Sequence, residues 1–309
     1  MTNISTTIGK VNFDNCLMNA AGILCMSQAE LDSLKDSQAA TFVTKTATLQ
    51  ARPGNPEPRY YAFGDSSINS MGLPNLGIDF YLDYLKHDAR QAQRFLSIAP
   101  IQPDDLPQLI EKINQSHCHY QGMIELNLSC PNIPGKPQTA YDFEQTASLL
   151  DQIFSLSEHA IGVKLPPFFD LVHFDQMADL LNRYPLTFVT CINSLGNGLV
   201  INELSVAIKP KKGFGGLGGS IVKPTALANV HAFRQRLKDE IHVIGAGGVI
   251  TGRDVFEHIL CGADMVQIGS QLLKEGPEIF PRLQTELIEE MHRYGYQSLA
   301  DFRNQLKYI

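Results

Sequence analysis

Apolar runs of six to eight residues recur along the chain, and longer stretches with helical periodicity lie between most of them. Runs of this length, nearly all apolar, are typical of buried strands in a parallel sheet. We therefore predict eight strands, at residues 16–22, 42–47, 95–100, 123–129, 161–166, 188–194, 241–248 and 265–270.

Three of the intervening stretches carry an apolar stripe at helical spacing. The stripes are Phe143, Ala147, Leu150 and Phe154; Leu227, Val230 and Leu237; and Ile279, Leu283 and Leu287. Strands that alternate with helices indicate parallel pairing through right-handed crossovers. Eight such units predict an α/β fold, a single (β/α)8 TIM barrel domain over residues 1–309, with a doubly wound sheet as the alternative.

Three connections are longer than usual: residues 48–80, 130–141 and 195–222. Each follows a predicted strand, so each is a long βα-loop insertion at the C-terminal face of the barrel. Barrel enzymes place their chemistry at that face. We expect the functional site there.

Polar residues on the predicted strands mark candidate positions in this site. In MIELNLS (123–129) the period of two places Glu125 and Asn127 on one face and apolar residues on the other. We expect Glu125 to join a hydrogen-bond network inside the barrel and Asn127, near the strand end, to reach the site. Lys45 and Lys164 also lie on strands, where a lysine needs a counter-charge. Either Glu125 or a bound anionic ligand could supply it, and two such lysines favour the ligand.

Four asparagines fall at candidate positions of the same face: Asn69, Asn127, Asn132 and Asn193. An asparagine offers one acceptor and two donors, so several together suit a planar amide or imide ring. Asparagine is also a common turn residue, so each position alone is weak evidence.

Glycines end the last two predicted strands, in IGAGGVITG and QIGSQL. Backbone N–H groups freed by glycine can bind a phosphate, and many barrels bind phosphate with these two loops. Ordinary turn glycines are the alternative. The motif is not the G-x-G-x-x-G dinucleotide fingerprint, so a mononucleotide such as FMN fits better than NAD.

Charge and cysteine usage narrow the functional class. The net charge of -7 argues against a nucleic-acid-binding surface. The sequence contains no run of 18 apolar residues, so we predict no membrane span. Its first residues do not resemble a signal peptide. We therefore expect a cytoplasmic protein without a membrane partner. The six cysteines form no C-x-x-C pair, so we expect no metal or iron–sulfur cluster.

One cysteine stands apart from the others. Cys130, in LNLSCPNIPGKP, follows the end of a predicted strand and lies among polar residues. A cysteine is usually a small buried hydrophobe, and we expect that packing role for Cys16, Cys191 and Cys261. The position of Cys130 favours a thiol in the site.

These motifs resemble those of the dihydroorotate dehydrogenases, most closely the soluble fumarate-using class (class 1A). The resemblance runs through almost the whole chain. It is carried above all by INSMGLPN (68–75) and ELNLSCPNIPGKPQ (125–138), with TKTAT (44–48), GVKLPP (162–167), INSLGNG (192–198) and GAGG (245–248) in support.

The resemblance implies FMN across the C-terminal face and a dihydroorotate ring beside it. It implies cofactor contacts from Ala21, Gly22, Lys45, Asn127, Lys164, Ile192, Gly219, Gly247, Gly248, Gly269 and Ser270. It implies substrate contacts from Lys45, Asn69, Met71, Gly72, Leu73, Asn127, Asn132, Asn193 and Ser194. It also makes Cys130 the catalytic base and the 130–141 loop a mobile lid.

The implied reaction is oxidation of dihydroorotate to orotate in pyrimidine (UMP) biosynthesis, with fumarate reduced to succinate. A hydride passes to flavin N5 and a proton to Cys130. The alternatives are the catalytic subunit of an NAD-linked dihydroorotate dehydrogenase and a flavin-free phosphate-binding lyase or isomerase. The resemblance further implies a homodimer.

Overall fold

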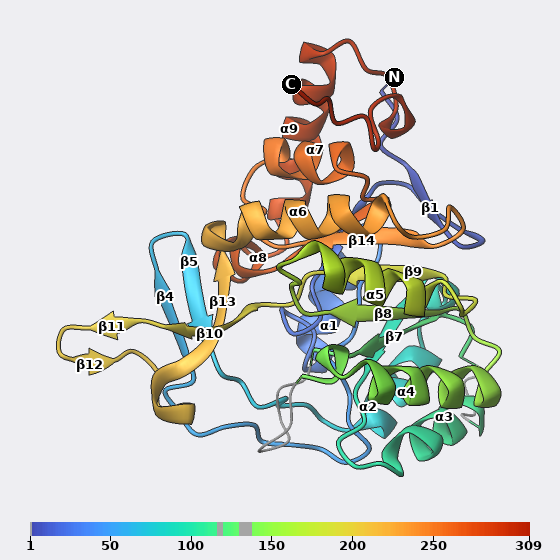
Figure 1. The fold of residues 1–309 in the computed structure, drawn as a ribbon, viewed down its shortest axis with the longest axis vertical. Helices are drawn as coiled ribbons and strands as arrows, with labels where there is room; N and C mark the ends of the chain where they lie inside the picture. Colours follow the sequence, from blue (N-terminus) through green and yellow to red (C-terminus); the bar gives the residue numbers. More distant parts are fainter. Residues whose placement is uncertain (1, 116–119, 130–137) are drawn as a thin grey trace.

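Seven parallel strands, with helices along the chain between them, form the main sheet of the computed structural model, which describes residues 2–115, 120–129 and 138–309. In space the strands run β3-β15-β14-β9-β8-β7-β6 (Figure 1). Their bounds are β3 Leu17–Asn19, β6 Phe95–Ile98, β7 Met123–Asn127, β8 Ile161–Leu165, β9 Phe188–Cys191, β14 His242–Ala246 and β15 Met265–Ile268.

The predicted strand at 42–47 closes this sheet, although it pairs only through isolated bridges. Thr41 pairs with Met18 of β3, and Val43 pairs with Phe95 of β6, both in parallel. The segment therefore stands between the two edge strands. The predicted (β/α)8 barrel is confirmed, and the doubly wound alternative is wrong. The one-domain assignment stays a prediction.

The three predicted helices are present, and each packs an apolar face inward. They correspond to α4 (Phe143–Leu156), α6 (Lys223–Arg234) and α9 (Ile279–Arg293). The helix α6 ends at Arg234, so Leu237 lies beyond it, and Val230 and Phe233 are its large buried residues. The helices of the described residues are α1 Gln28–Lys35, α2 Ile78–Lys86, α3 Asp105–Gln115, α4 Phe143–Leu156, α5 Leu171–Leu181, α6 Lys223–Arg234, α7 Gly252–Leu260, α8 Ser270–Glu275 and α9 Ile279–Arg293.

Local capping explains several helix starts. Ser27 and Glu30 form a capping box at α1, in which each side chain accepts a hydrogen bond from the other residue's backbone N–H. Asp142 caps α4 and accepts from the backbone N–H of Gln145. These residues satisfy N–H groups that a helix leaves unpaired at its first turn.

The alternation along each strand divides the core into two layers. Ile124 and Leu126 of β7 belong to the outer cluster between strands and helices, whereas Met123 belongs to an inner cluster inside the barrel. Ile8 and Phe13, from the hairpin of β1 (Thr6–Ile8) and β2 (Val11–Phe13), join the inner cluster. The hairpin therefore closes the N-terminal end of the barrel, and polar inward-facing residues such as Glu125 lie above this apolar layer.

Two of the long connections form a second sheet that the sequence did not predict. Its antiparallel order is β10-β13-β5-β4, and it lies to one side of the barrel (Figure 1). The bounds are β4 Tyr60–Phe63, β5 Ser66–Asn69, β10 Leu195–Leu199 and β13 Phe214–Gly219. The glycines of β13 permit close packing, since a Cβ at Gly216 would lie 2.2 Å from Oγ of Ser194.

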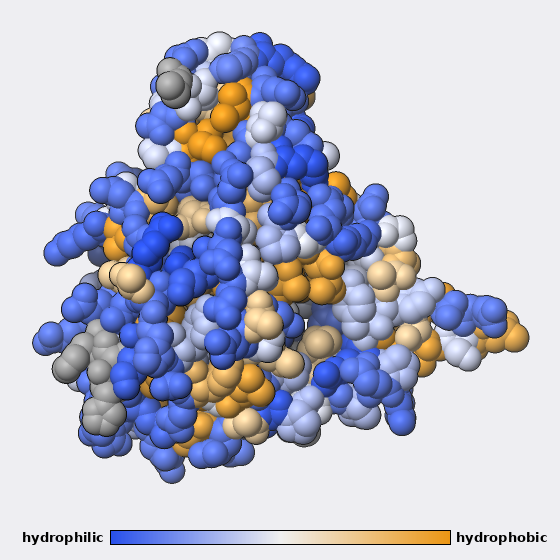
Figure 2. All heavy atoms as spheres, turned by 180° about the vertical axis from the view of Figure 1, so that it is seen from behind, coloured by the Kyte–Doolittle hydropathy of each residue, from blue (hydrophilic) through white to orange (hydrophobic). Residues whose placement is uncertain are grey.

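A hairpin of β11 (Ile201–Asn202) and β12 (Ser205–Val206) projects from this sheet. Its apolar side chains face solvent, and Leu204 at its turn is fully exposed. Figure 2 shows the hairpin as a projecting arm with hydrophobic and hydrophilic residues together at its tip. Within the part of the chain that the structure describes, every helix is too short or too polar to cross a membrane.

Candidate active site

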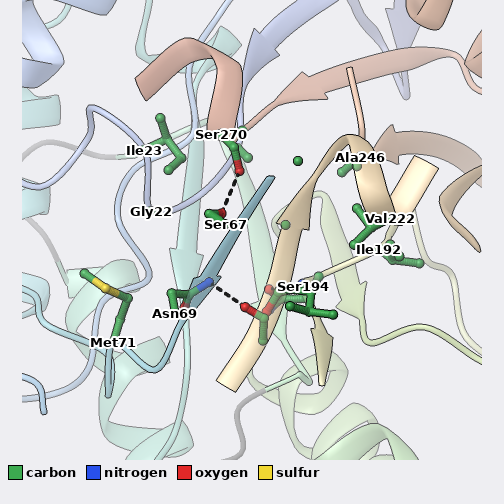
Figure 3. Close-up of a pocket in the computed structure, with 18 of the residues that line it drawn as sticks. Gly22, Ile23, Ser67, Asn69, Met71, Ile192, Ser194, Val222, Ala246 and Ser270 are labelled. Atoms are coloured by element: carbon green, nitrogen blue, oxygen red, sulfur yellow. Dashed lines mark hydrogen bonds between the residues drawn. The ribbon is translucent and has the colours of Figure 1, made fainter. Parts of the chain in front are cut away.

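A pocket of about 410 Å³ lies where the C-terminal ends of the barrel strands meet the small antiparallel sheet (Figure 3). Barrel residues supply one wall, among them Ala246, at the end of β14, and Ile192, just after β9. Ser67 and Asn69 of β5 come from the small sheet. The volume is within the range of small-molecule sites.

The predicted site residues that the structure describes all line this one pocket. The predicted cofactor contacts among its lining residues are Ala21, Gly22, Lys45, Asn127, Lys164, Ile192, Gly219, Gly247, Gly248, Gly269 and Ser270. The predicted substrate contacts among them are Lys45, Asn69, Met71, Gly72, Leu73, Asn127, Asn193 and Ser194. Cys130 and Asn132, with most of the expected lid, lie outside the described residues.

Four buried polar residues from four barrel strands form a hydrogen-bonded chain that begins at the pocket floor and continues behind it. Nζ of Lys164 donates to Oε1 of Gln267 at 2.9 Å. Nε2 of Gln267 donates to Oε2 of Glu125 at 3.1 Å, and Thr190 donates to the same oxygen at 2.9 Å. Glu125 does join an internal network, as predicted, but Gln267 stands between it and Lys164.

The second lysine has a different environment. Lys45 is 7% exposed, and its only hydrogen bond to a described residue is a long one, 3.4 Å, from its ammonium to the carbonyl of Gly22. Burial lowers the pKa of Lys45, because the charged form has lost water. Cys25 lies nearby, and burial raises the pKa of its thiol to about 11. A buried ammonium with one weak partner is a suitable contact for an anionic group in the pocket.

Side chains around the glycine-rich end of the pocket form hydrogen bonds with it or pack closely against it. Nε2 of His258 on α7 donates to the carbonyl of Gly247 at 3.0 Å. Gly248 has φ of +76°, and a Cβ there would lie 2.3 Å from Cβ of Lys223. Ser270 bonds Ser67 across the pocket at 3.3 Å, which links the barrel to the small sheet (Figure 3).

The asparagines retain hydrogen-bonding capacity toward the pocket. Nδ2 of Asn69 donates to the carbonyl of Gly216 at 3.2 Å, and this bond does not use the side-chain oxygen of Asn69 (Figure 3). Oδ1 of Asn193 accepts from the backbone N–H of Ser194 at 2.8 Å, which leaves the amide NH2 available. The site therefore offers both donors and acceptors to a polar ring.

Sequence reasoning missed two lining residues that matter to the site. Gln267 is a fully buried polar residue in the strand MVQIGS, and the argument applied to Glu125 would have found it. Ser67 lies in a strand of the unpredicted sheet, so no pattern in the sequence indicated that its side chain would line the pocket. The packing role expected for Cys16, Cys191 and Cys261 is confirmed by their burial.

Comparisons with known proteins agree with this site. A family model described as dihydroorotate dehydrogenase matches residues 3–291. A relative from Streptococcus agalactiae named dihydroorotate dehydrogenase A (fumarate) is 57% identical over 312 residues, covering 100% of both chains. One of the same name from Streptococcus pyogenes is 58% identical, covering 100% of this chain and 99% of its own.

Solved structures support the fold. The chain is similar to DHODH from Eimeria tenella in complex with ferulenol, with a TM-score of 0.80 and 20% identity over 98% of this chain and 88% of that one. The ligand-free form from the same organism gives a TM-score of 0.81, with 20% identity over 97% and 91% of the two chains. At this identity the likeness concerns the barrel fold.

Proposed function

Since this chain belongs to the dihydroorotate dehydrogenase family, and to its fumarate-using class, we propose that its pocket oxidises dihydroorotate to orotate on a bound FMN. The chain is an oxidoreductase that uses fumarate as the electron acceptor, and its reaction is a step of pyrimidine biosynthesis. The observation that carries the proposal is the single pocket in which the described family-type residues meet.

Members of this family depend on a flavin, and the chemistry of the pocket suits FMN. FMN supplies a ring that accepts and returns a hydride. The glycine-rich end formed by Gly247, Gly248 and Gly269, with the hydroxyl of Ser270, would hold its phosphate. The buried ammonium of Lys164 would face the ring, where a cation favours the anionic reduced form.

The substrate would lie over the polar side of the pocket. Asn69 and Asn193 retain amide groups that can bond the ring of dihydroorotate. The backbone of Gly72 and the ammonium of Lys45 would meet its carboxylate. A substrate anion would also compensate the burial that lowers the pKa of Lys45.

Dihydroorotate loses a proton from C5 and a hydride from C6, so the site needs a base. We assign that role to Cys130, which follows directly on Ser129 of the pocket wall. A positioned base contributes about 10²–10⁴ in rate. Asn132 would add a substrate contact from the same loop, the loop that we expect to act as a lid.

Assembly and location are part of the proposal. We propose that the protein works as a homodimer in the cytoplasm, with orotate and succinate as the products released. The arm of β11 and β12 exposes Ile201, Leu204 and Val206 together, and such a cluster supports an association between copies because it would gain free energy on burial.

Anaerobic spectroscopy of the purified protein tests the function. Dihydroorotate should bleach a bound flavin near its visible absorption maximum, and fumarate should then restore the absorbance while NAD does not. A protein without flavin would refute the cofactor assignment. Reoxidation by NAD alone would instead make the chain a subunit of the NAD-linked type.

A matched pair of variants isolates the site. Lys45→Met removes the ammonium that would meet the carboxylate, and it should raise the KM for dihydroorotate at least tenfold. Lys112→Met removes an exposed ion pair with Asp79 on the barrel exterior and should leave KM unchanged. Equal behaviour of the two variants would contradict the placement of the substrate.

A further inference from the structure

The glutamine between Lys164 and Glu125 separates two charges that could otherwise form a direct ion pair. Oε1 of Gln267 accepts from Lys164 at 2.9 Å, and Nε2 of Gln267 donates to Glu125 at 3.1 Å. An amide is suited to this position, because it presents an acceptor to an ammonium and a donor to a carboxylate. All three side chains are buried, with at most 4% exposed.

The Glu125 carboxylate is itself incompletely paired. Both of its hydrogen bonds, from Thr190 and Gln267, reach the single oxygen Oε2. Its other oxygen, Oε1, is buried without a partner among the described residues. A carboxylate in this setting is only partly compensated, and a buried charge acts over a longer range than one in water.

The geometry has a direct consequence for the charge that reaches the pocket. Lys164 and Gln267 both line the pocket, whereas Glu125 lies behind them. Because an amide intervenes, the positive charge of Lys164 is not cancelled at the pocket floor. The negative charge of Glu125 reduces it from behind, and Gln267 fixes the separation.

We propose that Gln267 and Glu125 are positioning residues that set the electron affinity of the bound flavin through Lys164. Gln267 holds the ammonium in place, and Glu125 limits the positive charge that the flavin experiences. The inference rests on the proposed function, because it requires FMN above Lys164. It adds to that function a control of the reduction potential by residues that do not touch the substrate.

Two near-isosteric variants should act in opposite directions. Glu125→Gln removes the negative charge and still offers an oxygen to Gln267 and Thr190. The net positive field at the flavin ring therefore increases. Gln267→Glu brings a carboxylate next to the ammonium of Lys164, so the net positive field at the flavin ring decreases. Even if the two carboxylates of this variant share one proton, the remaining negative charge lies closer to Lys164.

Sulfite is a suitable probe that needs no turnover. The lone pair of its sulfur forms a bond to flavin N5, and the ring takes up the negative charge near N1 and O2. A stronger positive field at the ring therefore tightens sulfite binding, which bleaches the visible flavin band. We expect Glu125→Gln to lower the sulfite dissociation constant about three- to tenfold and Gln267→Glu to raise it by a similar factor.

The two-electron reduction potential, measured against a reference dye, should move in step. A tenfold change in the reduction equilibrium corresponds to about 30 mV. Glu125→Asp keeps the charge and serves as the conservative control, with sulfite affinity closer to wild type than that of Glu125→Gln. Each variant is informative by itself, so a folding failure of one leaves the other as a test.

The outcomes separate this inference from the proposed function. Unchanged sulfite affinity in both variants, or shifts in the same direction, would refute the inference even if wild-type flavin is reduced by dihydroorotate. A wild-type protein that binds FMN but is not reduced by dihydroorotate would refute the proposed function, while the sulfite comparison would still decide the role of Gln267 and Glu125.

Discussion

His258 is a buried histidine behind the glycine loop of the pocket, and we predict that it makes the fold sensitive to mild acid. Its side chain is fully buried, Nε2 donates to Gly247, and Nδ1 has no partner among the described residues. Burial lowers the pKa of His258 to about 4, because the imidazolium would be charged in a dry environment.

The size of the effect follows from the two protonation states. A histidine in the unfolded chain has a pKa of about 6.5, so between that value and 4 the unfolded chain binds a proton that the folded protein does not. Stability is therefore full above pH 6.5 and declines as the pH falls toward 4. The maximum loss is about 3 kcal/mol, of which about 2 kcal/mol occurs between pH 7 and pH 5.

Urea unfolding at several pH values measures this loss. His258→Gln removes the titrating group but retains an N–H that can reach the carbonyl of Gly247. The difference in free energy of unfolding between wild type and His258→Gln should shift by about 2 kcal/mol from pH 7 to pH 5, in favour of the variant. Parallel pH profiles for wild type and His258→Gln would refute the reasoning.

Three further predictions concern the pocket. Gly248→Ala should weaken FMN binding at least tenfold in equilibrium titration, because its Cβ would collide with Lys223 and φ is positive; tight binding would contradict the proposed phosphate site. Lys164→Ala should lose flavin during purification, and a protein that stays fully yellow would argue against its place near the ring. Cys130→Ala should keep FMN but be reduced by dihydroorotate at least about a hundredfold more slowly in stopped-flow measurements, and near-normal reduction would remove Cys130 from the role of base.

The barrel could be predicted because buried strands leave a strong signal. Each predicted strand is an apolar run whose partners lie in the sheet, and the period of two correctly separated Glu125 from its outward-facing neighbours. The rule that a buried parallel strand is nearly all apolar identified Lys164 as a buried cation. It could equally have identified Gln267, which lies at an inward-facing position of β15.

The small antiparallel sheet could not be predicted, for physical reasons. β13 reads FGGLGG, and glycine has little intrinsic preference for strands. It forms a strand because β5 and β10 supply hydrogen-bonding partners on either side. Most of its residues are glycines because a Cβ at several of these positions would collide with neighbouring atoms. Such a strand depends on tertiary contacts, and no local pattern in its own sequence reports them. The hydrogen bond from His258 to Gly247 is likewise a property of the assembled fold.

The small antiparallel sheet also has a consequence for how the molecule is assembled in time. Asn69 and Gly216, which pair across β5 and β13, are 147 positions apart in the chain. Closing so long a loop loses conformational entropy before the stabilising contact forms, so pairings of this kind form late. Neighbouring barrel strands such as β7 and β8 pair over a much shorter span, with Ile124 and Ile161 only 37 positions apart (161 minus 124). We expect such local barrel pairs to form first and this sheet to dock onto them afterwards. The ligand pocket would then be completed last, and hydrogen exchange should find β13 among the strands that open most readily.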